Sequence, residues 1–142
     1  MLRLALRALL ALSGIAVIAV GLNVGLGGIL TLGWQIAPDF VSIGDPAAFV
    51  TQDSHVRFLG GIFTILGAVL VSGAALLPRF WSGFGALCAL MPLAGLFRFS
   101  GGMDAVFRNG LAASLVFEFI LFPFMAVAIW RLYGRRQGVE PQ

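Results

Sequence analysis

The sequence predicts an all-α integral membrane protein: a four-helix bundle with cytoplasmic N and C termini and a short helix in its external first loop. Of its 142 residues, 60% are hydrophobic and 11% are charged, whereas soluble globular domains carry about 25% charged residues. The mean hydropathy is +1.02, and the apolar residues gather in runs of about the 20 residues that cross a bilayer. This composition excludes a soluble enzyme, and the length allows one domain.

We expect residues 1–142 to form a single transmembrane domain, with helices over about residues 8–33, 57–77, 80–98 and 111–131. The first run is interpreted as a retained helix, because its apolar stretch of about 25 residues exceeds the 7–15 of a signal peptide. Trp34, Trp81 and Trp130 stand at the ends of runs, where aromatic side chains favour the membrane interface. Only Pro78 and Arg79 separate the second and third runs, which predicts a tight turn between antiparallel neighbours.

Residues 35–54 form the one sizeable polar loop. Asp45 followed by Pro46 is typical of a helix N-cap with proline at the first helical position, and it predicts the short external helix. Asp53 and Arg57 have the i, i+4 spacing of an ion pair on the approach to the second helix.

The distribution of arginines predicts the topology. If the N-terminus is cytoplasmic, the arginines on the inside are Arg3, Arg7, Arg79, Arg131, Arg135 and Arg136, and those on the outside are Arg57, Arg98 and Arg108. Cytoplasmic loops carry an excess of Lys and Arg. We therefore expect a multi-pass membrane protein with both termini in the cytoplasm.

Small residues predict where the helices pack, because helices in lipid associate through close backbone approach rather than through hydrophobic burial. Residues of this kind recur at spacing four in the first two helices: Gly21 and Gly25, then Gly60, Thr64, Ala68 and Ser72. Pro92 and Pro123 each remove a helical hydrogen-bond donor, so kinks are expected in the third and fourth helices.

Glu118 is the polar residue that needs most explanation. It lies about 10 Å below the outer end of the fourth run, at 1.5 Å per residue. A charge at this depth usually faces the bundle interior and finds a partner. Arg98 is the first candidate partner and Arg57 the second, while Ser114 lies one turn away and Asn23 has a comparable depth in the first helix.

Two interpretations of this predicted cluster remain open. In the first, Glu118 forms a buried ion pair with an arginine, and the pair fixes the register of the helices. In the second, the cluster is a ligand or proton site open to the outer face. Burial would raise the pKa of a carboxyl group and a close arginine would lower it, so the sequence leaves its protonation state open.

The order of several residues resembles a known family. The pattern is Arg-x-x-Gly-Gly opening the second helix, an arginine closing the third, an aspartate soon after it and a glutamate within the fourth: Arg57, Gly60, Gly61, Arg98, Asp104 and Glu118. Over residues 9–130 the chain resembles domain of unknown function 4345, a family of small bacterial four-helix membrane proteins that are distantly DoxX-like. The resemblance implies four helices with an external first loop and no assigned activity.

The sequence favours a non-enzymatic accessory or structural subunit of a membrane assembly. One histidine and one cysteine exclude a bis-His haem and an internal disulfide, and no cofactor, metal or nucleic acid is expected. The expected partners are the bilayer, other membrane proteins or further copies of the chain, and contact with a lipophilic ligand or pigment is compatible with the apolar surface. The alternative is a small transporter or lipophilic-ligand binder that uses a buried Glu–Arg site; a quinone-binding oxidoreductase is a weaker third.

Overall fold

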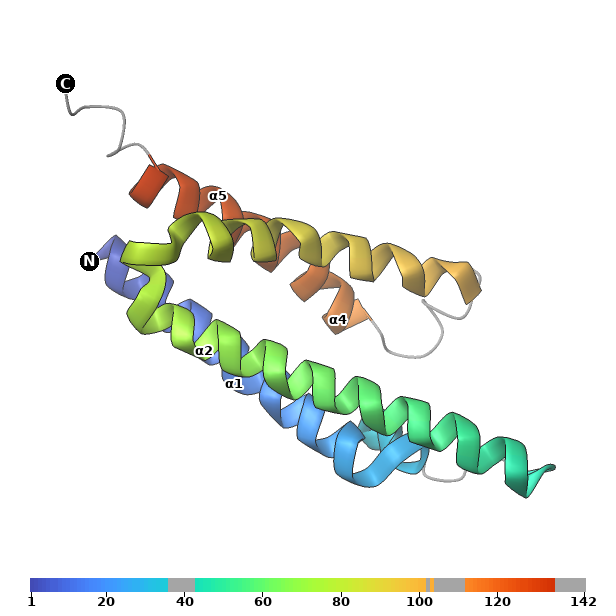
Figure 1. Cartoon of the computed structure of the whole chain (residues 1–142). Coiled ribbons are helices and arrows are strands. Elements are labelled where there is room, and N and C mark those ends of the chain that lie inside the picture. Colours follow the sequence, from blue (N-terminus) through green and yellow to red (C-terminus); the bar gives the residue numbers. More distant parts are fainter. Residues whose placement is uncertain (36–42, 102, 104–111, 135–142) are drawn as a thin grey trace. The chain divides into compact units, whose positions relative to one another are not determined.

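The computed structural model describes residues 1–35, 43–101, 103 and 112–134, and its regular elements over these residues are helical (Figure 1). In chain order they are α1 (Leu2–Gly27), η1 (Gly28–Gln35, 3-10), α2 (Pro46–Phe97), η2 (Arg98–Gly101, 3-10), α4 (Ala112–Val116), η3 (Phe117–Leu121, a π-helix) and α5 (Phe122–Tyr133). Residues 36–42 of the predicted first loop, and with them Asp39, lie outside the described residues, as do Asp104, Arg108, Arg135 and Arg136.

Three helical stretches are long and apolar enough to cross a membrane: Leu2–Thr31, Pro46–Ser100 and Ser114–Tyr133. The second and third runs both lie in α2, whose two helical halves meet at a kink, so the count of four helices stays a prediction. Pro78 and Arg79 remain helical, and only Phe80 leaves the helical region, with φ −119° and ψ 33°. The kink at Phe80 divides the 52 residues of α2 into residues 46–79 and residues 81–97, so α2 is two helices joined by a bend rather than one straight helix.

The predicted short external helix is the beginning of α2 rather than a separate element. Asp45 caps it as expected, since its Oδ1 accepts hydrogen bonds from the backbone N–H groups of Ala47 and Ala48 at 2.9 and 3.2 Å. Pro46 occupies the first helical position. The sequence has no further glycine or proline before Gly60, so nothing ends the helix and it continues into the apolar run.

The chain divides into two compact units, one formed by residues 11–72 and the other by residues 1–10 and 73–142. In the first, α1 and the beginning of α2 approach so closely that glycine is required. A Cβ on Gly14 would lie 2.6 Å from the carbonyl oxygen of Gly67, and a Cβ on Gly21 would lie 2.8 Å from that of Gly60. Gly60 in turn faces the backbone of Gly25.

The stripe of small residues on α2 differs in part from the predicted one. Gly60 and Thr64 lie against α1, but the contact then continues through Gly67 rather than Ala68, which is exposed. The reason is the 3.6-residue period of the helix, because a strict spacing of four drifts off the contact face within two turns. Ser72 is half-buried, and its hydroxyl donates to the carbonyl of Val69 at 2.7 Å.

Gly28 ends α1 in the left-handed conformation, with φ +70°. The next N–H, of Ile29, donates to Asp53 Oδ1 at 2.8 Å, and Arg57 donates to the last carbonyls of α1, those of Leu26 at 2.5 Å and Gly27 at 3.4 Å. The positive charge of Arg57 thus lies at the C-terminal end of α1, which is the negative end of the helix dipole. Arg57 is held in place by the predicted ion pair with Asp53, at 2.7 Å.

Gly28→Ala is expected to destabilise the protein by about 1–2 kcal/mol, the cost of a left-handed residue with a side chain. The new methyl group would also meet the Asp53 carboxylate. Denaturation of the purified full chain in mixed micelles measures the loss. Gly44→Ala is the control, because Gly44 lies in open space without a positive φ; equal effects at the two glycines would contradict the assignment.

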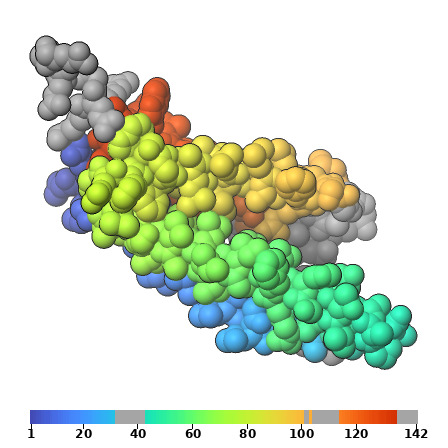
Figure 2. Space-filling model, viewed as in Figure 1, coloured from blue at the N-terminus to red at the C-terminus, as the bar shows by residue number. Residues whose placement is uncertain are grey.

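In the second unit, the first turns of α1, the later part of α2 and α5 share an apolar core. Its most buried side chains are Leu10, Leu77, Cys88, Phe122, Met125 and Ile129. Other side chains in this part of α2, which is yellow to orange in Figure 2, are more than half exposed: Leu90, Leu93 and Leu96. This apolar exterior suits a lipid environment.

The two intrahelical prolines have different surroundings. Pro92 lies within α2, where the backbone angles stay helical, so the kink predicted there is not accompanied by a break in the helix. Pro123 comes directly after the π-helix η3 and stands at the start of α5. The irregularity predicted near Pro123 therefore takes the form of a widened turn just before it, a common response to a missing donor.

Candidate functional site

Glu118 is positioned by the widened turn η3. The N–H of Phe122 donates to the carbonyl of Phe117, five residues earlier, which is the hydrogen bond that defines a π-helix. Such turns inside α-helices are frequently found at functional sites. Within this turn Glu118 is buried, while Phe117 and Phe119 on either side of it are exposed.

The side chain of Glu118 meets Arg98 in a fork-to-carboxylate ion pair. Arg98 Nη2 donates to Oε1 at 2.7 Å, and Nε lies 3.1 Å from Oε1 and 3.0 Å from Oε2. Bidentate pairs of this kind are the strong charge-assisted hydrogen bonds of proteins. The Glu118 side chain is 12% exposed and that of Arg98 34%, so the acid is enclosed while the cation partly faces outward.

Gly95 makes this approach to α2 feasible. A Cβ at this position would lie 2.9 Å from Glu118 Oε2 and 2.6 Å from the Phe119 ring. Arg98 stands one turn later in η2, and the Phe99 ring lies 6.4 Å from that of Phe119 in a tilted arrangement. The backbone at Gly95 therefore lies on one side of the ion pair, and the rings of Phe99 and Phe119 lie beside it.

The other members of the predicted cluster have different surroundings. Ser114 lies one turn before Glu118 in α4 and is half-buried. Arg57 and Asn23 belong to the unit of residues 11–72, where Arg57 is engaged by Asp53 and the end of α1, and where Asn23 is exposed. The structure thus pairs Glu118 with Arg98, the first candidate partner, while the guanidinium of Arg57 donates to carbonyls at the end of α1.

This arrangement constrains the chemistry. The Glu118 carboxylate already accepts three contacts from one guanidinium, which occupies the oxygens that a general base would use. Arg98 has five N–H donors, of which those on Nε and Nη2 face the acid. Among residues 1–35, 43–101, 103 and 112–134, no group of three His, Cys, Asp or Glu side chains could hold a metal ion.

Sequence reasoning missed Gly95 and the contacts of Arg3 and Arg7. Gly95 stands three residues before Arg98, and a small residue one turn from a candidate partner of Glu118 was the available signal. Arg3 and Arg7 entered only as topology markers, yet Arg3 donates to the Leu132 carbonyl at 2.9 Å and Arg7 donates to the Ala74 carbonyl. These partners lie far away in the sequence, and no local pattern indicates them.

Comparison with curated proteins and with solved structures gives no match. Residues 5–129 match the family described as Domain of unknown function (DUF4345). The match includes α1 from Ala5, the whole of α2 and the turn that carries Glu118. The chain therefore belongs to the DUF4345 family, as the order of its arginines, glycines and glutamate had indicated.

Proposed function

We propose that this protein is a non-enzymatic accessory or structural subunit of an assembly in the bacterial inner membrane, with four membrane crossings and both termini in the cytoplasm. The observation that carries the proposal is the Arg98–Glu118 pair. The Glu118 carboxylate is enclosed against the backbone at Gly95, and its oxygens accept hydrogen bonds from Arg98. A pair in this position is suited to fixing the register of one helix on the other. It is not disposed as an open reaction centre.

Contacts at one end of the second unit support the topology. Arg3 near the start of α1 reaches Leu132 near the end of α5, and Arg7 reaches Ala74, four residues before Pro78. The beginning of the first helix, the bend of α2 and the end of the last helix therefore meet. A chain whose two ends lie at the same membrane face crosses the membrane an even number of times. This condition is met if α1, each half of α2 and the last helix cross once each, which makes four crossings.

An apolar stripe on η3 and α5 supports a protein partner. Phe117, Ile120 and Phe124 are 42%, 63% and 61% exposed, and aromatic residues are enriched at protein interfaces. The stripe lies on the turn that carries Glu118, so loss of the ion pair would disturb the surface offered to a partner.

Glu118→Gln is the discriminating test. In an accessory subunit the variant should lower thermal stability and the yield of the co-purified assembly by several-fold, because the register of η3 on α2 is loosened. The measurement is gentle extraction from native membranes, followed by mass spectrometry of complexes with fixed stoichiometry. Phe124→Ser should release the partner while Leu93→Ser on α2 retains it. A chain that purifies as a lone monomer would refute the accessory role.

The alternative is a small transporter or ligand-binding protein that uses Glu118 and Arg98. The observation favouring it is the π-helix at Glu118 together with the partial exposure of Arg98, whose outer donors could bind an anion. In that case Glu118→Gln should abolish proton-linked flux in proteoliposomes while the protein stays folded and its complexes remain intact.

A further inference from the structure

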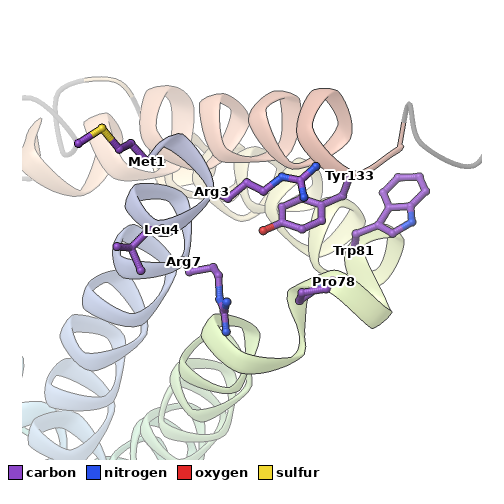
Figure 3. A pocket seen from close by; sticks show the side chains of 7 residues that line it. All are labelled: Met1, Arg3, Leu4, Arg7, Pro78, Trp81 and Tyr133. Atoms are coloured by element: carbon purple, nitrogen blue, oxygen red, sulfur yellow. The ribbon is translucent and has the colours of Figure 1, made fainter.

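A basic pocket lies at the end of the second unit where α1 begins, and it is separate from the Arg98–Glu118 pair. Its cavity volume is about 590 Å³. Figure 3 shows its lining: Arg3 and Arg7 come from one side of α1, Pro78 and Trp81 from the bend of α2, and Tyr133 from the end of α5. Among the residues that the structure describes, the lining contains two cations and no acidic side chain.

Both arginines are held in place by backbone contacts and keep donors for a ligand. Arg3 uses Nη2 on the Leu132 carbonyl, and its guanidinium carbon lies 5.0 Å from the centre of the Tyr133 ring. Arg7 uses Nε on the Ala74 carbonyl. A guanidinium has five N–H donors, so most of the donors in the pocket are not used by these contacts. Two guanidinium groups that line one pocket favour an anion as its ligand.

An apolar groove of about 430 Å³ shares one lining residue, Trp81, with this pocket. It runs between α2 and α5 over small residues, among them Gly85, Ala86, Ala89 and Ala126, and it is bounded by Trp81 and Trp130. Trp81 lines the groove and the basic pocket alike. Side chains this small leave a channel along the helices that a hydrocarbon chain fills without displacing packed groups.

We propose that the pocket and the groove together bind one anionic phospholipid, with its phosphate on Arg3 and Arg7 and an acyl chain along Gly85, Ala86 and Ala89. The groove alone would accept any hydrocarbon, and the pocket alone any small anion. Their junction at Trp81 selects a molecule that joins the two. Basic pockets between membrane helices on the cytoplasmic side are suited to anionic headgroups, and Trp and Tyr favour the same interfacial level.

This inference goes beyond the proposed accessory role and does not depend on it, because a transporter would use the same lipid site. The experiment is native mass spectrometry of the detergent-purified full chain, titrated with phosphatidylglycerol or with phosphatidylcholine of identical acyl chains. The wild-type protein should retain one phosphatidylglycerol at least tenfold more tightly than phosphatidylcholine. Equal retention of the two lipids would overturn the proposal.

The variants test each half of the site. A juxtamembrane basic residue contributes about 1 kcal/mol to binding of anionic lipid, so Arg3→Gln/Arg7→Gln should weaken phosphatidylglycerol about 30-fold, at tenfold per 1.4 kcal/mol. Arg131→Gln, an exposed arginine outside the pocket, should have little effect. Should the double variant fail to fold, Arg3→Lys/Arg7→Lys keeps the charge and should retain the preference for phosphatidylglycerol. Loss of affinity of the same size in Arg131→Gln would contradict the site.

The groove variant separates a lipid from a free anion. Ala86→Leu should lower retention of phosphatidylglycerol several-fold, whereas Ala94→Leu, at an exposed position of α2 outside the groove, should not. Inorganic phosphate at millimolar concentration should compete weakly. Full competition by inorganic phosphate, with no effect of Ala86→Leu, would show a simple anion site and refute the lipid.

Discussion

Arg98→Met is expected to lower the free energy of unfolding by about 3 kcal/mol, measured on the full chain by denaturation in mixed micelles. The methionine would leave the Glu118 carboxylate without its donors at a position where 12% of its side chain is exposed. Removing one partner of a buried pair typically costs 3–5 kcal/mol, and the 34% exposure of Arg98 places the expected loss at the lower end.

The double variant Arg98→Met/Glu118→Met provides the control. Replacing both charged partners by apolar groups leaves no unpaired charge. The loss of unfolding free energy in the double variant should therefore be smaller than the sum of the losses in the two single variants, by at least about 1 kcal/mol. Arg131→Met, on an exposed arginine of α5, should change stability little. Additive losses from Arg98→Met and Glu118→Met would mean that the two side chains do not stabilise one another.

Gly60→Ala and Gly61→Ala are expected to change stability in opposite directions. A Cβ on Gly60 would collide with the backbone of Gly25 and lie 2.8 Å from the carbonyl oxygen of Gly21. Backbone cannot move aside as a side chain can, so α1 and α2 must separate, at a cost of about 2–3 kcal/mol for overpacking. Gly61 has nothing within 4 Å of its Cβ position, and alanine there should gain up to about 1 kcal/mol of helix propensity.

Unfolding of both variants in the same detergent measures this difference between neighbouring glycines. Thr64→Ser keeps the hydroxyl that donates to the Gly60 carbonyl at 3.0 Å and should be nearly neutral. A Gly60→Ala protein as stable as the wild type would mean that the two helices are not in close contact at this level.

Local patterns were sufficient for several features of this protein. The apolar runs indicated the helical stretches that are long and apolar enough to cross a membrane, and Asp45 followed by Pro46 indicated where α2 begins. The spacing of Asp53 and Arg57 indicated their ion pair. Arg98 was the nearest arginine to Glu118 at the outer ends of the third and fourth runs, and the structure places the two side chains together. Each of these predictions depends on neighbours in sequence or on the cost of a charge in lipid.

Features that depend on long-range contacts could not be predicted in this way. Arg57 turns to the carbonyls at the end of α1 because Gly25 and Gly60 bring the two helices together there. The pocket around Arg3 and Trp81 requires the start of α1, the bend of α2 and the end of α5 to meet. The exact position of the break between the second and third runs was also missed, since it lies at Phe80, directly after Pro78 and Arg79.

The widened turn of η3 has an evolutionary consequence. A π-helical turn corresponds to one residue inserted into a regular α-helix, and the widened turn absorbs this residue, so the helix that follows keeps its orientation. A relative with one residue fewer between Val116 and Phe122 should therefore form a regular α-helix there and keep Met125 and Ile129 in the core. What changes is the direction of the side chains within the turn, so such deletions should occur mainly in relatives that lack the glutamate or the arginine.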